Sequence, residues 1–282
     1  MNQFQSFRRD VVTIESCCET ILQMIQETEQ ALVDAPAGTL YIKKNGRKAE
    51  YYYRHPGTGN RKIYIPQRQM ELACLLAQKD YNQKILKFLK KLLKETEKVS
   101  ESSCAVFATG LPYPQIDAVY YALSLERQAL VKPIIPTTDQ YVREWLSCPY
   151  EPKPFHPDDK SAYYTRKNER VRSKSELHMA DKIDYVGIPR LYEFPLEIRG
   201  KILHPDFTLL DITTRREKYL EHCGMMDNPE YLDNFLWKMD FYRDNGIHPG
   251  EDLIVTMESS ARPLNTRIFD LILRHYFPNA FR

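Results

Sequence analysis

Two acidic residues in the C-terminal third of the chain have a spacing that suits a shared metal ion. Asp206 follows a proline and opens the apolar run Phe-Thr-Leu-Leu, and Glu221 comes fifteen residues later. A carboxylate in such an interior strand pattern is costly unless it has a partner. Carboxylates on neighbouring strands supply the hard oxygen ligands that Mg²⁺ or Mn²⁺ takes, and a metal held in this way activates water for phosphodiester hydrolysis.

A third acid, Glu176, opens a helical segment in the run Ser-Lys-Ser-Glu. This run fits the capping box, in which the glutamate satisfies backbone N–H groups at the start of a helix. Glu176 therefore has two readings, as a helix cap or as an acid that completes a metal site. The two roles compete for the same side chain.

Phosphodiester hydrolysis also benefits from a nearby cation that stabilises negative charge in the transition state. Residues i and i+2 of a strand share a face, so Cys223 stands beside Glu221 where a cation is expected. A thiol is mostly uncharged and cannot take that role. The best substitute is Lys238, which lies on the following helix beside an apolar stripe formed by Phe235, Phe241 and Tyr242. The alternative is a lysine whose stem only passes an apolar face.

Hydrophobic periodicity predicts the elements that must position these residues. From residue 173 on, the order of elements is helix, three strands, helix, strand and helix. The three strands are YEFPLEI, KILHPDFTLLD and EKYLEHCG, and the fourth is DLIVTME. The helices are SKSELHMADKIDYVG, residues 228–245 and NTRIFDLILRHYF. The fold class is therefore α/β.

Residues 172–282 resemble the PD-(D/E)XK nuclease superfamily, whose restriction-endonuclease-like core has the order αβββαβ. The matching residues are Pro205-Asp206, Glu221 and Glu176. The runs SKSE, PDFT, LEHCGM and EYLDNFLWKMDFYRDNGI resemble a subgroup in which Glu-His replaces Glu-x-Lys on the third strand. In several members of the superfamily the lysine has moved to the following helix, the position of Lys238 here.

The resemblance implies a Mg²⁺- or Mn²⁺-dependent nuclease that hydrolyses DNA, with DNA favoured over RNA. Asp206 and Glu221 would bind the metal, and Glu176 would complete its shell. The backbone carbonyl of His222 would add a ligand, and Lys238 would stabilise the attacked phosphate. Two other readings stay open: an inactive nuclease-like module that binds nucleic acid, and a structural or oligomerisation protein.

Residues 1–100 are expected to form long helices on either side of a β-hairpin that turns at Asn45-Gly46, a dipeptide typical of tight hairpins. The hairpin interleaves tyrosines with a set of basic residues: Lys43, Lys44, Arg47, Lys48, Arg54, Arg61 and Lys62. This mixture suits phosphate neutralisation and base stacking. Because tyrosine is also a good strand former, ordinary sheet packing is an equal alternative.

The remaining expectations concern domain organisation, net charge, localisation and self-association. Residues 101–170 read as a helical and irregular connector, and residues 171–282 as the nuclease-like domain. The formal net charge of +2 does not by itself announce a nucleic-acid binder. No signal peptide and no membrane span is recognisable, which predicts a cytoplasmic protein without a membrane partner. The long N-terminal helices are a candidate surface for self-association.

Overall fold

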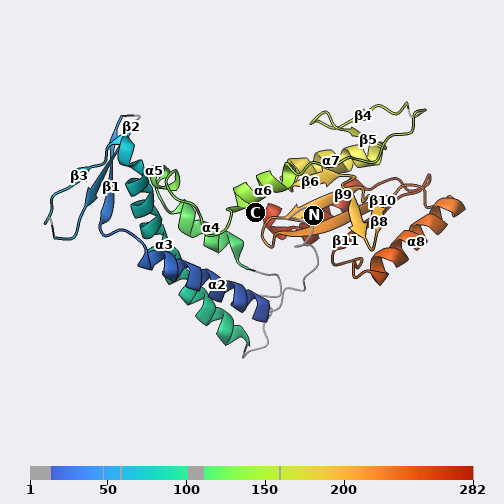
Figure 1. Cartoon of the computed structure of the whole chain (residues 1–282). Helices are drawn as coiled ribbons and strands as arrows, with labels where there is room; N and C mark the ends of the chain where they lie inside the picture. The colour runs from blue at the N-terminus through green and yellow to red at the C-terminus, as the bar shows by residue number, and fades with distance from the viewer. Residues whose placement is uncertain (1–13, 47, 58, 101–110, 159, 282) are drawn as a thin grey trace. The chain divides into compact units, whose positions relative to one another are not determined.

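The computed structural model describes residues 14–46, 48–57, 59–100, 111–158 and 160–281 (Figure 1). These residues form two compact units that divide between Tyr141 and Val142. The fold is mixed α/β, with helices and a β-hairpin in the first unit and mixed sheets and helices in the second. Each unit has its own hydrophobic core.

The first unit pairs two long helices with a small antiparallel sheet. Its main elements are α2 (Ile14–Val33), β1 (Thr39–Asn45), β2 (Lys48–Arg54), β3 (Ile63–Tyr64), η1 (Gln67–Gln69) and α3 (Met70–Ser100), followed by α4 (Tyr113–Tyr121) and α5 (Leu125–Gln128). The predicted hairpin turn is confirmed at Gly46, whose φ is +61°. The segment read as a connector also contributes to this core, through Ile116, Leu123 and Val131.

The second unit contains a four-stranded sheet in the order β11-β10-β9-β6. Its elements begin with most of α6 (Thr138–Leu146), followed by β4 (Tyr163–Tyr164), β5 (Arg170–Val171), α7 (Lys174–Val186), β6 (Arg190–Tyr192), β7 (Leu196–Ile198), β8 (Lys201–Leu203), β9 (Phe207–Asp211), β10 (Arg216–Cys223), α8 (Pro229–Asp244), β11 (Leu253–Met257), α9 (Thr266–Tyr276) and η2 (Pro278–Phe281). Strand β10 is antiparallel to β9 and parallel to β11.

The two faces of this sheet bury different cores. On one face, Leu209, Leu220 and Ile254 pack with side chains of α7 and α9. On the other face, Tyr219 and Leu253 pack with α8 and with the β7-β8 hairpin. Alternation along β10 therefore assigns each of its side chains to one of these two layers.

Two of the predicted strands were wrong in their extent. The run YEFPLEI is split into β6 and β7, which belong to different sheets, and KILHPDFTLLD is split into β8 and β9. The first break has a physical cause in Glu193, whose φ is +47°, and in the proline two residues later, which has no N–H to donate. Pro205 interrupts the second run in the same way. A β7-β8 hairpin is thereby inserted between the first two strands of the sheet.

Within the described residues, no helix combines the length and the apolar character that crossing a bilayer requires.

Candidate metal site

Asp206 and Glu221 lie side by side on one face of the four-stranded sheet. The ladder between β9 and β10 ends with Phe207 opposite Leu220, and the same register extended by one residue places Asp206 opposite Glu221. Thr208 and Tyr219, two residues further along each strand, are also opposite one another. Because side chains alternate between faces, Asp206 and Glu221 share the face that α8 covers.

Lys238 reaches the same face from α8. Its Nζ lies 2.6 Å from Oε1 and 2.7 Å from Oε2 of Glu221. Tyr242, one helical turn further on, donates its hydroxyl hydrogen to Oε1 of Glu221 at 2.6 Å. Burial alone would lower the pKa of Lys238, but Glu221 and Asp206 outweigh it and raise that pKa above its usual value. The amine is therefore a permanent cation at neutral pH.

Cys223 points to the same face as Glu221 but carries no charge. Its side chain is buried, and burial together with the carboxylates of Glu221 and Asp206 raises the pKa of the thiol to about 12. The strand position at which the sequence led us to expect a cation thus holds a neutral group. The cation at this face comes from α8 instead.

Asp206 lies among like charges. Burial, followed by the nearby carboxylates of Glu221 and Glu176, raises the pKa of Asp206 well above its usual value, and Lys238 offsets part of that rise. Its Oδ2 accepts a hydrogen bond of 2.6 Å from the backbone N–H of His222. Two further acids and one lysine therefore act on Asp206 at this point of the sheet.

The backbone of His222 is also directed to this point. In a strand, the N–H and C=O of one residue point to the same edge. The N–H of His222 points to Asp206, whereas the neighbouring Cys223 carbonyl accepts from Glu258 N on the β11 side. The carbonyl of His222 accordingly faces the Asp206 side, where a backbone ligand was predicted.

Glu176 makes part of the predicted cap at the start of α7 and also a contact beyond it. The hydroxyl of Ser173 accepts from the backbone N–H of Glu176 at 3.1 Å, which is half of a capping box. The Glu176 carboxylate accepts from the N–H of Arg172 at 3.0 Å and from the hydroxyl of Tyr192 at 2.7 Å. The side chain is nearly buried and acts on Asp206, so it borders the acidic pair.

The imidazole of His222 belongs to the opposite face of the sheet. Its Nδ1 lies 2.8 Å from the hydroxyl of Thr256, and its Nε2 lies 3.2 Å from Oε1 of Glu258. Glu258 also accepts from the hydroxyl of Ser175 and from the N–H of Leu264. This buried network ties β10, β11 and α7 together behind the acidic pair.

Sequence reasoning missed the roles of two tyrosines, Tyr242 and Tyr192, that contact acids of the site. Tyr242 was read as a packing residue, although it lies four residues after Lys238 on the same helical face. Tyr192 and Glu258 bind their partners only through tertiary contacts, so no local spacing in the sequence marks them. The i+4 spacing from Lys238 to Tyr242 was the one sequence signal that could have predicted a contact of Tyr242 with the site.

The residues predicted to contact nucleic acid have different environments. Lys43, Lys48, Arg61 and Lys62 are exposed, and Arg47 lies outside the described residues. Lys44 forms an ion pair with Glu126 at 2.8 Å. Arg54 donates to Asn60. The predicted set is therefore not one uniform surface.

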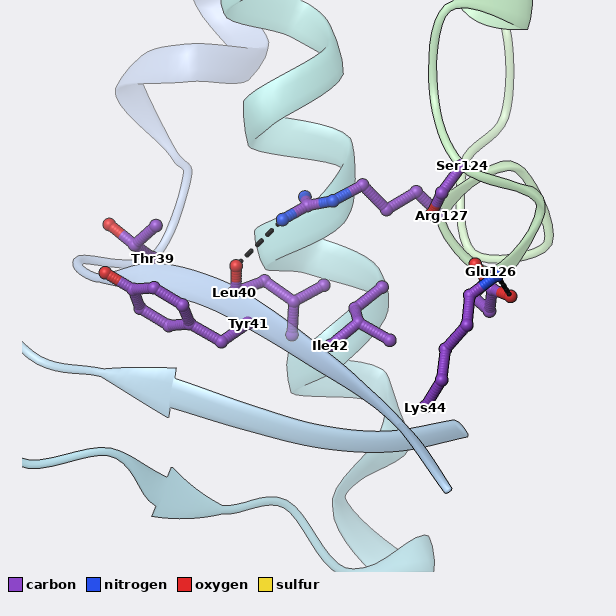
Figure 2. A pocket seen from close by; sticks show the side chains of 8 residues that line it. All are labelled: Thr39, Leu40, Tyr41, Ile42, Lys44, Ser124, Glu126 and Arg127. Atoms are coloured by element: carbon purple, nitrogen blue, oxygen red, sulfur yellow. Dashed lines mark hydrogen bonds and ion pairs between the residues drawn. The ribbon is translucent and has the colours of Figure 1, made fainter. Parts of the chain in front are cut away.

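A pocket of about 450 Å³ lies in the first unit between β1 and α5 (Figure 2). Its two cations already have partners: Lys44 with Glu126, and Arg127 with the carbonyl oxygen of Leu40 at 2.8 Å and with Asp80 at 3.0 Å. A more open hollow of about 680 Å³ is lined by Met225, Asp227, Asn228, Pro229 and Glu230, just after β10. The first pocket has no part in the acidic site.

The oxygen atoms at this site suit a hard divalent cation that takes only a few of its ligands from the protein. Within the described part of the chain, no three His, Cys, Asp or Glu side chains are grouped around one metal position. Mg²⁺ is commonly held by one or two carboxylates together with water and substrate oxygens. Asp206, Glu221 and the carbonyl of His222 match that requirement, and the mutual repulsion of the acids is what a cation relieves.

Comparisons with protein-family models, with curated proteins and with solved structures returned no match for this chain. The case for a function therefore depends on the residues and geometry of the site.

Proposed function

We propose that the chain is a metal-dependent nuclease that hydrolyses DNA phosphodiester bonds at the Asp206–Glu221 face of its second unit. The observation that carries the proposal is the ion pair between Lys238 of α8 and Glu221 of β10. Asp206, just before β9, lies opposite Glu221 when the β9-β10 register is extended by one residue. The order of α7, β6, β9, β10, α8 and β11 also suits the restriction-endonuclease-like core, with the β7-β8 hairpin as an insertion.

Each group has a separate task in this proposal. Asp206, Glu221 and the carbonyl of His222 would hold Mg²⁺ or Mn²⁺, which when bound supplies an activated water and neutralises phosphate charge. Lys238 places a fixed positive charge where negative charge develops on the attacked phosphate. Glu176 borders Asp206 and would hold water in the outer part of the site.

Tyr242 and His222 keep these groups in position. The hydroxyl of Tyr242 fixes Oε1 of Glu221, and the backbone N–H of His222 fixes Oδ2 of Asp206. Both contacts restrict the rotamers of acids that repel one another. Such restriction is what a catalytic arrangement needs, because small displacements of its groups cost rate.

A cleavage assay tests the proposal. Labelled single- and double-stranded DNA and RNA are incubated with the full chain in Mg²⁺, Mn²⁺ or EDTA, alongside Asp206→Ala. We expect cleavage of DNA that requires the metal and is lost in Asp206→Ala. An exposed acid on the same unit, changed in Asp244→Ala, is the matched control and should retain activity. Absence of cleavage with every substrate and metal would refute the proposal.

A further inference from the structure

The outward face of the small sheet in the first unit carries a row of three tyrosines. Tyr41 of β1 is opposite Tyr52 of β2, and Tyr52 is opposite Tyr64 of β3. The rings of Tyr52 and Tyr64 are 5.5 Å apart, edge to face. The row therefore crosses all three strands of this sheet.

Strand alternation separates this row from the tyrosines that pack inside. Tyr51 and Tyr53 share their face with Leu40 and pack against the core that α3 helps to form. Tyr64 is 55% exposed. More than half of this residue's surface is therefore open to a partner.

Basic residues surround the tyrosine row on the same face. Register and alternation assign four of them to it: Lys43, Lys48, Arg54 and Lys62. The Nζ of Lys62 lies 4.2 Å from the centre of the Tyr41 ring. Glu50 is the acid on this face, and it accepts a hydrogen bond from the Tyr52 hydroxyl at 2.8 Å. The outer face thus has a positive charge balance.

We propose that this outer face binds single-stranded nucleic acid, with bases stacked on the tyrosine row and phosphates neutralised by the flanking cations. Aromatic rings stack on any exposed base, and lysine or arginine neutralises the backbone without reading sequence. In a duplex the bases already stack on one another, so their faces are not offered to the tyrosines. The inference is independent of the proposed catalysis, because the tyrosine row and the acidic site belong to different compact units.

Fluorescence anisotropy in EDTA tests the inference with the full chain. The labelled probes are a thymidine homopolymer, the matching uridine homopolymer, a duplex of the same length and an abasic strand with the same number of phosphates. We expect the two homopolymers to bind at least about tenfold more tightly than the duplex or the abasic strand. Equal binding of the abasic strand, tight binding of the duplex alone or absence of binding would each overturn the inference.

Substitutions then test which residues bind. Tyr64→Ala should weaken homopolymer binding about tenfold, while Tyr64→Phe should keep it, because stacking needs the ring and not the hydroxyl. Lys62→Glu should lower the slope of log affinity against log salt by at least about 0.7. Tyr185→Ala and Lys91→Glu, both at exposed positions outside this face, are the controls and should bind like the unchanged protein.

These measurements separate the inference from the proposed nuclease activity. Binding in EDTA requires no metal, so a chain that binds the homopolymers but never cleaves would keep the inference and refute the nuclease. If the chain cleaves DNA but Tyr64→Ala binds the homopolymers as tightly as the unchanged protein, the nuclease proposal would stand and the inference about the tyrosine row would be refuted. Thermal unfolding of each variant confirms that a loss of binding is not a loss of folding.

Discussion

The Nζ of Lys238 lies within 2.7 Å of both carboxylate oxygens of Glu221, although the two residues are seventeen positions apart in the sequence. The pair joins a cation to an acid that also faces Asp206. Cys223, on the same strand face, is neutral because its pKa is raised to about 12 by burial and by the two acids. The positive charge at the acidic face is therefore supplied by the helix and not by the strand.

Replacing Lys238 should reduce the rate of cleavage. Lys238→Met removes the charge that faces the phosphate, and we expect the single-turnover rate constant for cleavage to fall by about 10²- to 10³-fold. Arg243→Met, at an exposed position on the same helix, is the control and should keep the full rate. A rate within threefold of the unchanged protein for Lys238→Met would remove the lysine from the mechanism.

Returning a lysine to the strand should repair part of that loss. In the double variant Cys223→Lys with Lys238→Met, the amine starts from the residue two places after Glu221 and faces the same acids. We expect at least about a tenfold recovery of kcat over Lys238→Met alone. Cys223→Ser with Lys238→Met provides the comparison, since it changes the thiol without adding charge. Equal rates for the two double variants would show that the strand position cannot serve this site.

The hydroxyl of Tyr242 should contribute to both stability and rate. Tyr242→Phe removes the hydrogen bond to Glu221 inside a buried site, which should lower the free energy of unfolding by about 1–3 kcal/mol. Glu221 would keep its contact with Lys238 but would be less restricted, so cleavage should slow as well. Chemical denaturation measures the first effect. Tyr185→Phe, at an exposed tyrosine, should change neither quantity, and a Tyr242→Phe protein as stable as the parent would contradict the argument.

Asp206 should be a destabilising residue in the absence of metal. Its pKa is raised by burial and by Glu221 and Glu176, so the folded state binds its proton more tightly than the unfolded state does. Stability is therefore lost as pH rises above the unfolded pKa of an aspartate. Asp206→Asn should raise the Tm at pH 7 in EDTA, and the gain should shrink at pH 4. A lower Tm for Asp206→Asn at pH 7 would contradict this sign.

Glu258 should stabilise the fold at neutral pH, whereas Asp206 should destabilise it. Although burial alone would raise its pKa, the hydrogen bonds from Ser175 and Leu264 and the nearby imidazole of His222 outweigh it and lower that pKa. Its stabilising effect is present above the ordinary glutamate pKa of 4.5 and is lost as pH falls through the lowered value. Glu258→Gln should therefore be less stable than the parent at pH 7, with the difference vanishing in acid. A difference that is constant with pH would refute the assignment.

The sequence predicted the helices and the third and fourth strands of the second unit, because their apolar periods are long and continuous. It could not predict the breaks at Glu193 and Pro205. A positive φ at Glu193 depends on tertiary contacts, among them the two hydrogen bonds that its carboxylate accepts from Arg172. Periodicity read through the break and merged two strands into one.

The same limit applies to the site. The shared face of Asp206 and Glu221 follows from strand alternation once the register is known, and the register is set by the β9-β10 ladder. The stripe on α8 placed Lys238 beside the sheet but left open whether its amine turns toward Glu221. Tyr192 and Glu258 meet their partners from other elements. Such contacts are decided by packing, which a spacing pattern does not contain.

Metal binding in the absence of nucleic acid tests the acidic site most directly. Isothermal titration of the full chain with Mn²⁺ should give one site, lost in Asp206→Asn and in Glu221→Gln and retained in Asp244→Asn. Bound Mn²⁺ should also raise the Tm of the unchanged protein and not that of Asp206→Asn. Failure of the unchanged protein to bind Mn²⁺, or binding that persists in both Asp206→Asn and Glu221→Gln, would contradict the proposed metal site.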